Sequence, residues 1–139
     1  MSNADHPAIK AATLSIKYAS EGNREAWLDL YADDAIVKDP VGVSPFDPSG
    51  EGHQGKTAIA AFWDNVISQS KISMGADKRI VSGPRHCASL QWVANDLGDG
   101  KSTRNEMMAT YEVNEEGKIT QMFAHWDFDG LMEQLANQG

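Results

Sequence analysis

Apolar residues recur at helical spacing in the first half of this 139-residue chain and at alternating positions in the second half. The helical spacing predicts a helix over residues 7–21, on which Ser15 and Tyr18 share the apolar stripe. Gly22 is expected to end this helix, and Asn23 is a favourable N-cap for a shorter second helix. We therefore expect Ser15 and Tyr18 to face the core.

The middle of the chain predicts an extended segment, a long loop and a third helix. Residues 35–39 read as a short strand, and the Pro- and Gly-rich residues 43–55 read as a loop. A strong apolar stripe then predicts a helix over residues 56–70, with Phe62 and Trp63 on its buried face. This helix needs the same core as the first two, so we expect residues 1–139 to form a single domain.

From residue 72 onward the period is two, with turn signals at residues 83–84, 98–100 and 114–117. This pattern predicts about four strands in an antiparallel meander, and helices followed by strands indicate an α+β fold. The inward positions expected on the last two strands are Asn105, Met107, Ala109, Tyr111, Val113, Thr120, Met122, Ala124, Trp126 and Phe128. Phe123, Ile119 and Met108 are expected on the outer face, which suggests a homodimer through the back of the sheet.

A curved antiparallel sheet wrapped around helices forms a cone that encloses a pocket for a small hydrophobic ligand. The residues expected to line this pocket are Tyr18, Phe62, Trp63, Trp92, Met107, Ala109, Tyr111, Met122, Ala124 and Trp126.

Asp39 is the candidate for acid/base chemistry. It follows the apolar pair Ile36 and Val37 and precedes Pro40 and Val41. A carboxyl group with so little polar company tends to have a raised pKa, as a general base near neutral pH needs. The alternative is that Asp39 caps a turn before Pro40, and the local pattern supports both interpretations equally.

Composition narrows the classes of partner. The formal net charge is −8 and no Lys/Arg stripe is present, which argues against nucleic acid as a partner. No segment approaches membrane-spanning length or resembles a signal peptide, so we expect no membrane partner and a cytoplasmic location. Cys87 is the single cysteine, and the four His residues lack metal-ligand spacing, so we expect neither a disulfide nor a metal site.

Two further motifs are weaker. Residues 50–57, GEGHQGKT, satisfy the P-loop pattern, but FDPS precedes them where a buried strand is required. Loop geometry and helix capping are the better interpretation. His53 lies on the same loop and could reach the pocket mouth as an acid/base partner, although a solvated loop histidine explains it more simply.

The order of elements, with AWLDLYADDAIVKDPVG followed by GHQGKTAIAAFW, resembles the ketosteroid isomerase and SnoaL-like branch of the NTF2-like superfamily. The resemblance spans nearly the whole chain, and DPVG is its most specific part. It implies an NTF2-like α+β cone, commonly dimeric, with its pocket between helices and sheet. Asp39 matches the family's general base, which moves a proton between two carbons of a β,γ-unsaturated ketone.

The chain departs from this family where the oxyanion donors are expected. Ser15 stands at the position of the family's tyrosine, and Ala109 stands at that of its protonated aspartic acid. Tyr18, Asn105 and Tyr111 are the candidate replacements, although core packing explains both tyrosines equally well. Loss of one such donor typically lowers the rate about 10²–10³-fold.

Two functional hypotheses follow. The first is a cofactor-independent proton-transfer enzyme, an isomerase of the steroid Δ-isomerase type or a cyclase, with Asp39 as base and Tyr18 as donor. The second is a non-catalytic protein of the same fold that binds a small apolar ligand or serves as an accessory subunit. The absence of the two usual donors favours the second hypothesis.

Overall fold

The structure, a computed structural model, describes residues 3–138. Its helices are η1 (Asn3–Asp5), α1 (Pro7–Glu21), α2 (Arg24–Asp29), α3 (Gly55–Asn65), η2 (Ile67–Gln69) and α4 (Phe128–Gln138). Its strands are β1 (Tyr31–Lys38), β2 (His53–Gln54), β3 (Lys71–Ser82), β4 (His86–Gly98), β5 (Lys101–Val113) and β6 (Ile119–His125). The predicted α+β fold is confirmed, and β3 to β6 form the predicted meander.

The first helix begins and ends where the sequence predicts. The second begins after Asn23 as predicted but ends at Asp29, so β1 starts at Tyr31 rather than at the predicted residue 35. The Gly22 backbone adopts the left-handed conformation after α1, with φ of 69°, and its N–H donates to the carbonyl of Ala19. The Asn23 side chain accepts a hydrogen bond from the Ala26 N–H at 3.3 Å. These caps are local, which is why sequence alone located them.

The third helix is shorter than predicted, because α3 ends at Asn65 and η2 follows. Continuing the helix would require the Asp64 carbonyl to accept from the Ser68 N–H. Instead the Ser68 hydroxyl and the Gln69 side-chain amide donate to that carbonyl, at 2.7 and 2.9 Å. Side chains that compete for a backbone carbonyl in this way favour helix termination.

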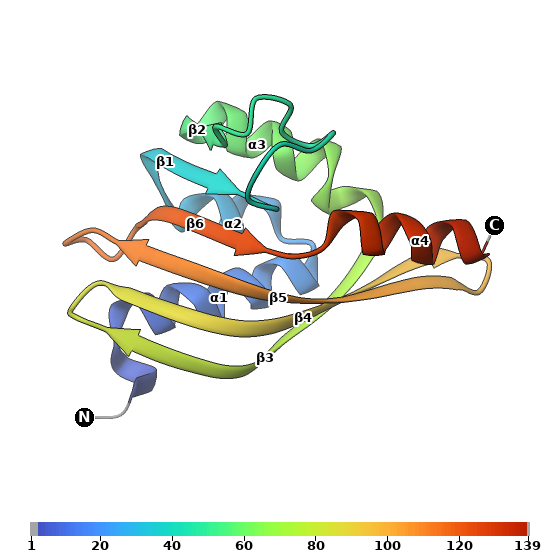
Figure 1. The fold of residues 1–139 in the computed structure, drawn as a ribbon. Helices are drawn as coiled ribbons and strands as arrows, with labels where there is room; N and C mark the ends of the chain where they lie inside the picture. Colours follow the sequence, from blue (N-terminus) through green and yellow to red (C-terminus); the bar gives the residue numbers. More distant parts are fainter. Residues whose placement is uncertain (1–2, 139) are drawn as a thin grey trace.

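The six strands form one curved sheet in the order β2-β1-β6-β5-β4-β3. The sheet is mixed rather than purely antiparallel, because β1 runs parallel to β6 and every other neighbouring pair is antiparallel. The chain reaches β6 from β1 only through α3 and the meander, which permits the parallel pairing. In Figure 1 the long strands curve past α1, α3 lies above β1, and α4 extends beyond the end of β6.

The inward face of β5 is confirmed, since Met107, Ala109, Tyr111 and Val113 are all buried. The outward assignment of Ile119 is wrong, because its side chain is fully buried. The pairing shifts register between Glu112–Gln121 and Val113–Ile119, so Ile119 faces the core beside Val113. Met108 is exposed and Phe123 is partly buried on the outer face. The homodimer through this face stays a prediction.

The C-terminal helix α4 was not expected, and Phe128 is its first residue rather than the end of the last strand. Asp127 caps this helix by accepting a hydrogen bond from the Gly130 N–H at 3.0 Å. The Asp127 cap and the i, i+4 pair Leu131 and Leu135 are the sequence signals that would have located it.

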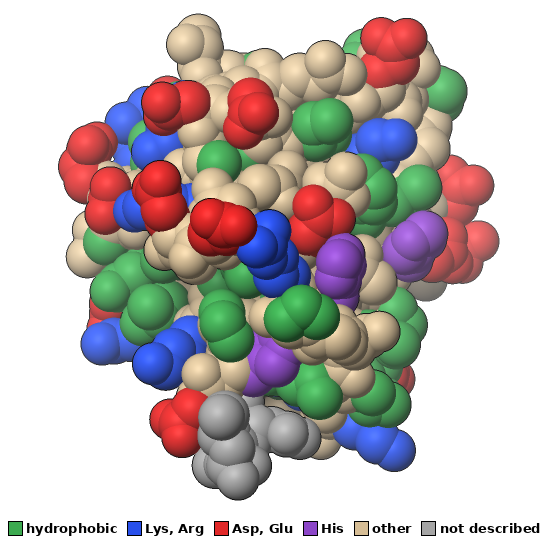
Figure 2. Space-filling view, turned by 90° about the vertical axis from the view of Figure 1, so that its left-hand side faces the viewer, with side chains coloured by type: hydrophobic (Ala, Val, Ile, Leu, Met, Phe, Trp, Pro, Cys, Tyr) green, Lys and Arg blue, Asp and Glu red, His purple; other side chains and the backbone are tan. Residues whose placement is uncertain are grey.

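The surface shows mixed charge. On the face in Figure 2, basic side chains lie dispersed among acidic ones, with no continuous basic stripe over the described residues. Among residues 3–138, no helix is both long and apolar enough to cross a membrane.

Candidate active site

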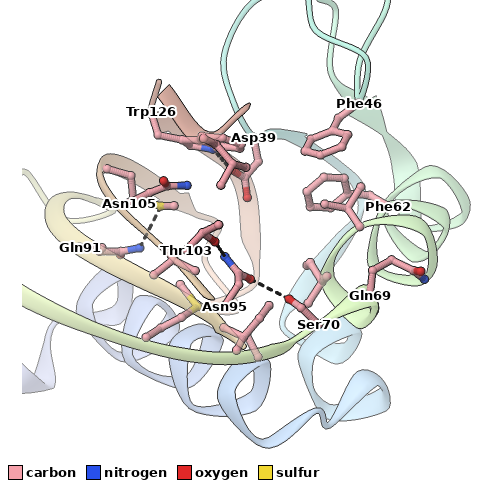
Figure 3. A pocket seen from close by; sticks show the side chains of 18 of the residues that line it. Asp39, Phe46, Phe62, Gln69, Ser70, Gln91, Asn95, Thr103, Asn105 and Trp126 are labelled. Carbon is pink, nitrogen blue, oxygen red and sulfur yellow. Dashed lines mark hydrogen bonds between the residues drawn. The ribbon is translucent and has the colours of Figure 1, made fainter. Parts of the chain in front are cut away.

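A cavity of about 320 Å³ lies between the inner face of the sheet and the helices. Its wall is largely apolar and includes α4 at one side through Leu131, Met132 and Leu135. Figure 3 shows its polar side chains, with Asp39 and Trp126 together in one part and Ser70, Asn95 and Thr103 in another. A mostly apolar cavity with a few convergent polar groups is typical of a small-molecule site.

Asp39 follows β1 directly, and backbone pairing fixes its position. Lys38 pairs with Phe123 of β6, and beyond Asp39 the Val41 N–H donates to the Ala124 carbonyl at 2.9 Å. The carboxyl group lines the cavity, and its Oδ1 accepts a hydrogen bond from the Trp126 Nε1–H at 2.5 Å. One carboxylate oxygen is therefore held by the indole, which leaves Oδ2 for chemistry.

Burial raises the pKa of Asp39 from 3.8 to about 6, although the hydrogen bond from Trp126 acts in the opposite direction. The desolvation arises because apolar and aromatic side chains surround the carboxyl group. Phe46 contributes to this wall and packs edge-on against Phe128, with 5.3 Å between ring centroids. The raised pKa expected from the sequence is present.

The long loop between β1 and β2 supplies Phe46 and is held in shape by Asp47. Backbone hydrogen bonds join Ser44 and Asp47 in both directions, and the Asp47 carboxylate accepts from the Gly52 N–H at 2.8 Å. In a P-loop, backbone N–H groups of this kind face a phosphate. Here a buried carboxylate already occupies the Gly52 N–H, which favours the loop-geometry interpretation of residues 50–57.

The structure brings eight of the sequence-predicted site residues into the cavity wall. They are Ser15, Asp39, Phe62, Asn105, Met107, Tyr111, Met122 and Trp126.

The other predicted residues lie elsewhere. Tyr18 packs against the outside of the core, with Lys17 over its ring at 5.8 Å. Trp63 is buried against Trp27, and Ala109 and Ala124 are fully buried in the sheet behind the cavity.

Trp92 is on the opposite face of the sheet from the cavity, with the Arg104 guanidinium over its ring at 4.7 Å. The inward set on β4 is instead Cys87, Ser89, Gln91 and Val93. Two of these four are polar, so the outer set containing Trp92 looks more apolar in sequence. Alternation along β4 alone therefore gives no signal that Gln91 faces inward.

Gln91 and Tyr111 form a buried polar pair in the cavity wall. The Tyr111 hydroxyl donates to Gln91 Oε1 at 3.2 Å, and the side-chain amide of Gln91 faces the thioether of Met107 at 3.8 Å. Burial raises the pKa of Tyr111 well above its usual range, so its hydroxyl stays protonated. Sulfur is a weak acceptor, so the Gln91 amide retains hydrogen-bonding capacity for a ligand oxygen.

Ser15 occupies a second position from which a proton could be donated. Its Oγ accepts from the Trp27 Nε1–H at 3.2 Å, which leaves the hydroxyl proton to be donated to a neighbouring oxygen. Tyr31 is nearby and fully buried. Burial raises the pKa of Tyr31, although a hydrogen bond with Ser15 acts in the opposite direction.

His53 lies on β2 and stacks on Phe62 with 4.6 Å between ring centroids, behind the cavity wall. Burial lowers the pKa of His53, which keeps its imidazole neutral. Among residues 3–138, no group of three or more His, Cys, Asp or Glu side chains is placed to hold a metal ion.

Helix α4 is docked by two glutamines on the part of β5 that extends beyond β6. The Gln134 side chain accepts from the Arg104 N–H and donates to its carbonyl, both at 2.9 Å. The Gln138 side chain pairs with the N–H and carbonyl of Ser102 in the same way, at 2.8 and 2.6 Å. Two amide groups four residues apart on a helix thus replace a neighbouring strand.

We expect the double variant Gln134→Ala/Gln138→Ala to loosen α4 and open one side of the cavity. Each pair of neutral hydrogen bonds contributes about 1–3 kcal/mol, so the Ser102 and Arg104 amides should exchange at least about fivefold faster with deuterium. Glu133→Ala, an exposed position on the same helix, is the control. Unchanged exchange at both amides would show that the glutamines do not hold the helix.

Comparisons with known proteins add to this geometry. The model of the SnoaL-like domain family matches residues 15–122. Three solved structures superpose on nearly the whole chain. RV0760c from Mycobacterium tuberculosis, in complex with estradiol-17β-hemisuccinate, is 32% identical with a TM-score of 0.84, covering 90% of this chain and 97% of its own.

The other two structures are similar in extent. The Δ5-3-ketosteroid isomerase from Mycobacterium sp. is 31% identical with a TM-score of 0.83, covering 89% of this chain and 95% of its own. A computationally designed 17-OHP binder is 30% identical with a TM-score of 0.82, covering 89% of this chain and 93% of its own.

Proposed function

The chain belongs to the SnoaL-like domain family, and from this premise we propose that it is a cofactor-independent proton-transfer enzyme with Asp39 as general base. The proposed substrate is a hydrophobic carbonyl compound, and the proposed reaction is isomerisation of a β,γ-unsaturated ketone to its conjugated isomer. The observation that carries this proposal is the Asp39 carboxyl group, which is raised in pKa to about 6 in a largely apolar cavity.

In the proposed reaction, Asp39 takes the proton from the carbon between the carbonyl and the double bond. The electrons of that C–H bond form a dienolate, and the same carboxyl group returns the proton to the γ-carbon. The hydrogen bond from Trp126 holds the carboxylate in one orientation, so the group needs little reorientation when it carries the proton from one carbon to the other. The base ends the cycle unprotonated, so no co-reactant is needed.

The dienolate oxygen requires hydrogen-bond donors, and the proposed donor is the side-chain amide of Gln91, oriented by Tyr111. These two residues take the place of the family's tyrosine and protonated aspartic acid, at whose positions this chain has Ser15 and Ala109. Tyr18 is withdrawn as a candidate, because it does not line the cavity.

The relatives support a ligand of this class. One of the three similar structures is a Δ5-3-ketosteroid isomerase, one contains estradiol-17β-hemisuccinate, and one binds 17-OHP. The test is to add a β,γ-unsaturated 3-ketosteroid to the protein and to follow the conjugated enone by ultraviolet absorbance. Enone formation above the buffer rate is expected, and its absence would contradict catalysis of this reaction.

We expect kcat/KM for this reaction to rise about tenfold per pH unit below the pKa of Asp39 and to level off above about pH 6. The base acts only when deprotonated, and the inflection in kcat/KM reports the free enzyme. Trp126→Phe removes the hydrogen bond that lowers this pKa, so its inflection should lie at higher pH. If kcat/KM were instead constant above pH 4.5, to within about half a pH unit, the base would have an ordinary carboxyl pKa, and a base of raised pKa would be ruled out.

A second candidate function is ligand binding without catalysis. The observation that favours it is the replacement of both usual oxyanion donors, at Ser15 and Ala109. It predicts that the ketosteroid binds and is released unchanged, and that Asp39→Asn leaves its dissociation constant intact.

A further inference from the structure

A second polar group lies in the cavity wall, formed by Ser70, Asn95 and Thr103. The Ser70 hydroxyl donates to Asn95 Oδ1 at 2.8 Å, and Asn95 Nδ2 donates to Thr103 Oγ1 at 3.2 Å. These three residues come from the end of η2, from β4 and from β5, and we call them the polar trio. Their hydrogen bonds run in one direction and end at Thr103.

The polar trio lies at the other side of the cavity from Asp39. Asp39 follows β1, whereas Asn95 lies on β4, three strand spacings away in the sheet order. The two are also displaced along the strands, because the β4 residue level with Ala124 beside Asp39 is Ser89, six positions before Asn95. Figure 3 shows the same separation, with Asp39 and Trp126 apart from Ser70, Asn95 and Thr103.

The trio retains hydrogen-bonding capacity. The Thr103 oxygen accepts from Asn95, so its own proton is left to donate, and Asn95 keeps a second N–H. The backbones of Asn95 and Thr103 are paired with each other in the β4–β5 ladder, so the strands do not need these side chains. Thr103 is 4% exposed, and a hydroxyl buried against an apolar wall is unfavourable unless it finds a partner.

We propose that the polar trio is a second recognition subsite that binds a neutral oxygen at the far end of an elongated polycyclic ketone. The inference rests on the proposed function, which places the reacting carbonyl near Asp39. The ligand oxygen would be a hydroxyl or a keto group, since the trio offers both donors and acceptors. A carboxylate or phosphate fits poorly, because the wall residues of this cavity include no Lys or Arg.

The test compares two probes that differ only at the remote end, androst-4-ene-3,17-dione and androst-4-en-3-one. Their dissociation constants are measured by titration of tryptophan fluorescence with wild type, Thr103→Val and Ser70→Ala. Thr103→Val keeps the side-chain shape and removes the hydroxyl. Thr110→Val is the matched control, because Thr110 lies on the same strand with its side chain on the exposed face.

Wild type should bind the dione more tightly than the mono-ketone. Thr103→Val should weaken dione binding by about 3–10-fold, and Ser70→Ala by a smaller factor, while the mono-ketone is unaffected. Equal changes for both probes, no change in either, or no binding of either by wild type would overturn the proposal. Turnover of the β,γ-unsaturated ketosteroid separates the two proposals. If wild type isomerises it but binds the dione and the mono-ketone equally, Asp39 remains the proposed base and the subsite is ruled out. If wild type distinguishes the two probes but does not isomerise the ketosteroid, the subsite remains and the proposed isomerisation is ruled out.

Discussion

Asp39→Asn is expected to lower kcat/KM for isomerisation of a β,γ-unsaturated 3-ketosteroid by about 10²–10⁴-fold. The amide cannot accept the proton from carbon at any pH used, while its Oδ1 can still accept the hydrogen bond from Trp126. The cavity and the fold should therefore remain intact. The measurement is enone absorbance under conditions where the substrate is far below KM.

Two controls make this result interpretable. Asp33→Asn changes an exposed carboxylate on β1 and should leave turnover unchanged. Binding of the conjugated product to Asp39→Asn should stay within about threefold of wild type, because the neutral side chain keeps the shape of the wall. Turnover of Asp39→Asn at the wild-type rate would remove Asp39 from the chemistry, whatever its pKa.

Gln91→Leu is expected to lower kcat by about 10²–10³-fold with a smaller change in KM, because the dienolate oxygen would lose its donor in the transition state. Leu is similar in volume and keeps the cavity wall closed. Tyr111→Phe should cost less, since Tyr111 orients Gln91 through the hydrogen bond to Oε1 and acts indirectly. The measurement is the separate determination of kcat and KM for both variants.

Gln121→Leu is the control for Gln91→Leu, because Gln121 lies on β6 outside the cavity wall. A Gln91→Leu enzyme with wild-type kcat would move the search for donors to Ser15 and Asn105, which also line the cavity. A change in KM alone would indicate that Gln91 binds substrate and transition state equally.

Much of the fold followed from local pattern. The caps at Gly22 and Asn23 and the inward set on β5 depend on residues adjacent in sequence, and the structure confirms all of them. The errors have the same origin. Ile119 turns inward through a register shift with β5, and Trp92 turns outward because its strand places Gln91 inside. Pairing partners and polar core residues are not visible in the periodicity of one strand.

Part of the candidate site could also be found without the structure. The apolar neighbours of Asp39 predicted its raised pKa, and the alternation on β5 predicted that Asn105, Met107 and Tyr111 face inward. Tyr18 illustrates the limit of this reasoning. It shares a helical stripe with Ser15, yet the cavity reaches only Ser15, because one stripe of a helix can span both core and cavity.

The sequence by itself determined α1, the start of α2, the meander of β3 to β6, the α+β class and the identity of Asp39 as the candidate base, because each depends on residues near in the chain. Only the tertiary structure decided which polar groups share the cavity with that base. The hydrogen bond between Asp39 and Trp126 joins residues 87 positions apart, and the Tyr111–Gln91 bond joins residues 20 apart. Such contacts depend on sheet curvature and strand order, which set the distance between side chains that no local pattern relates.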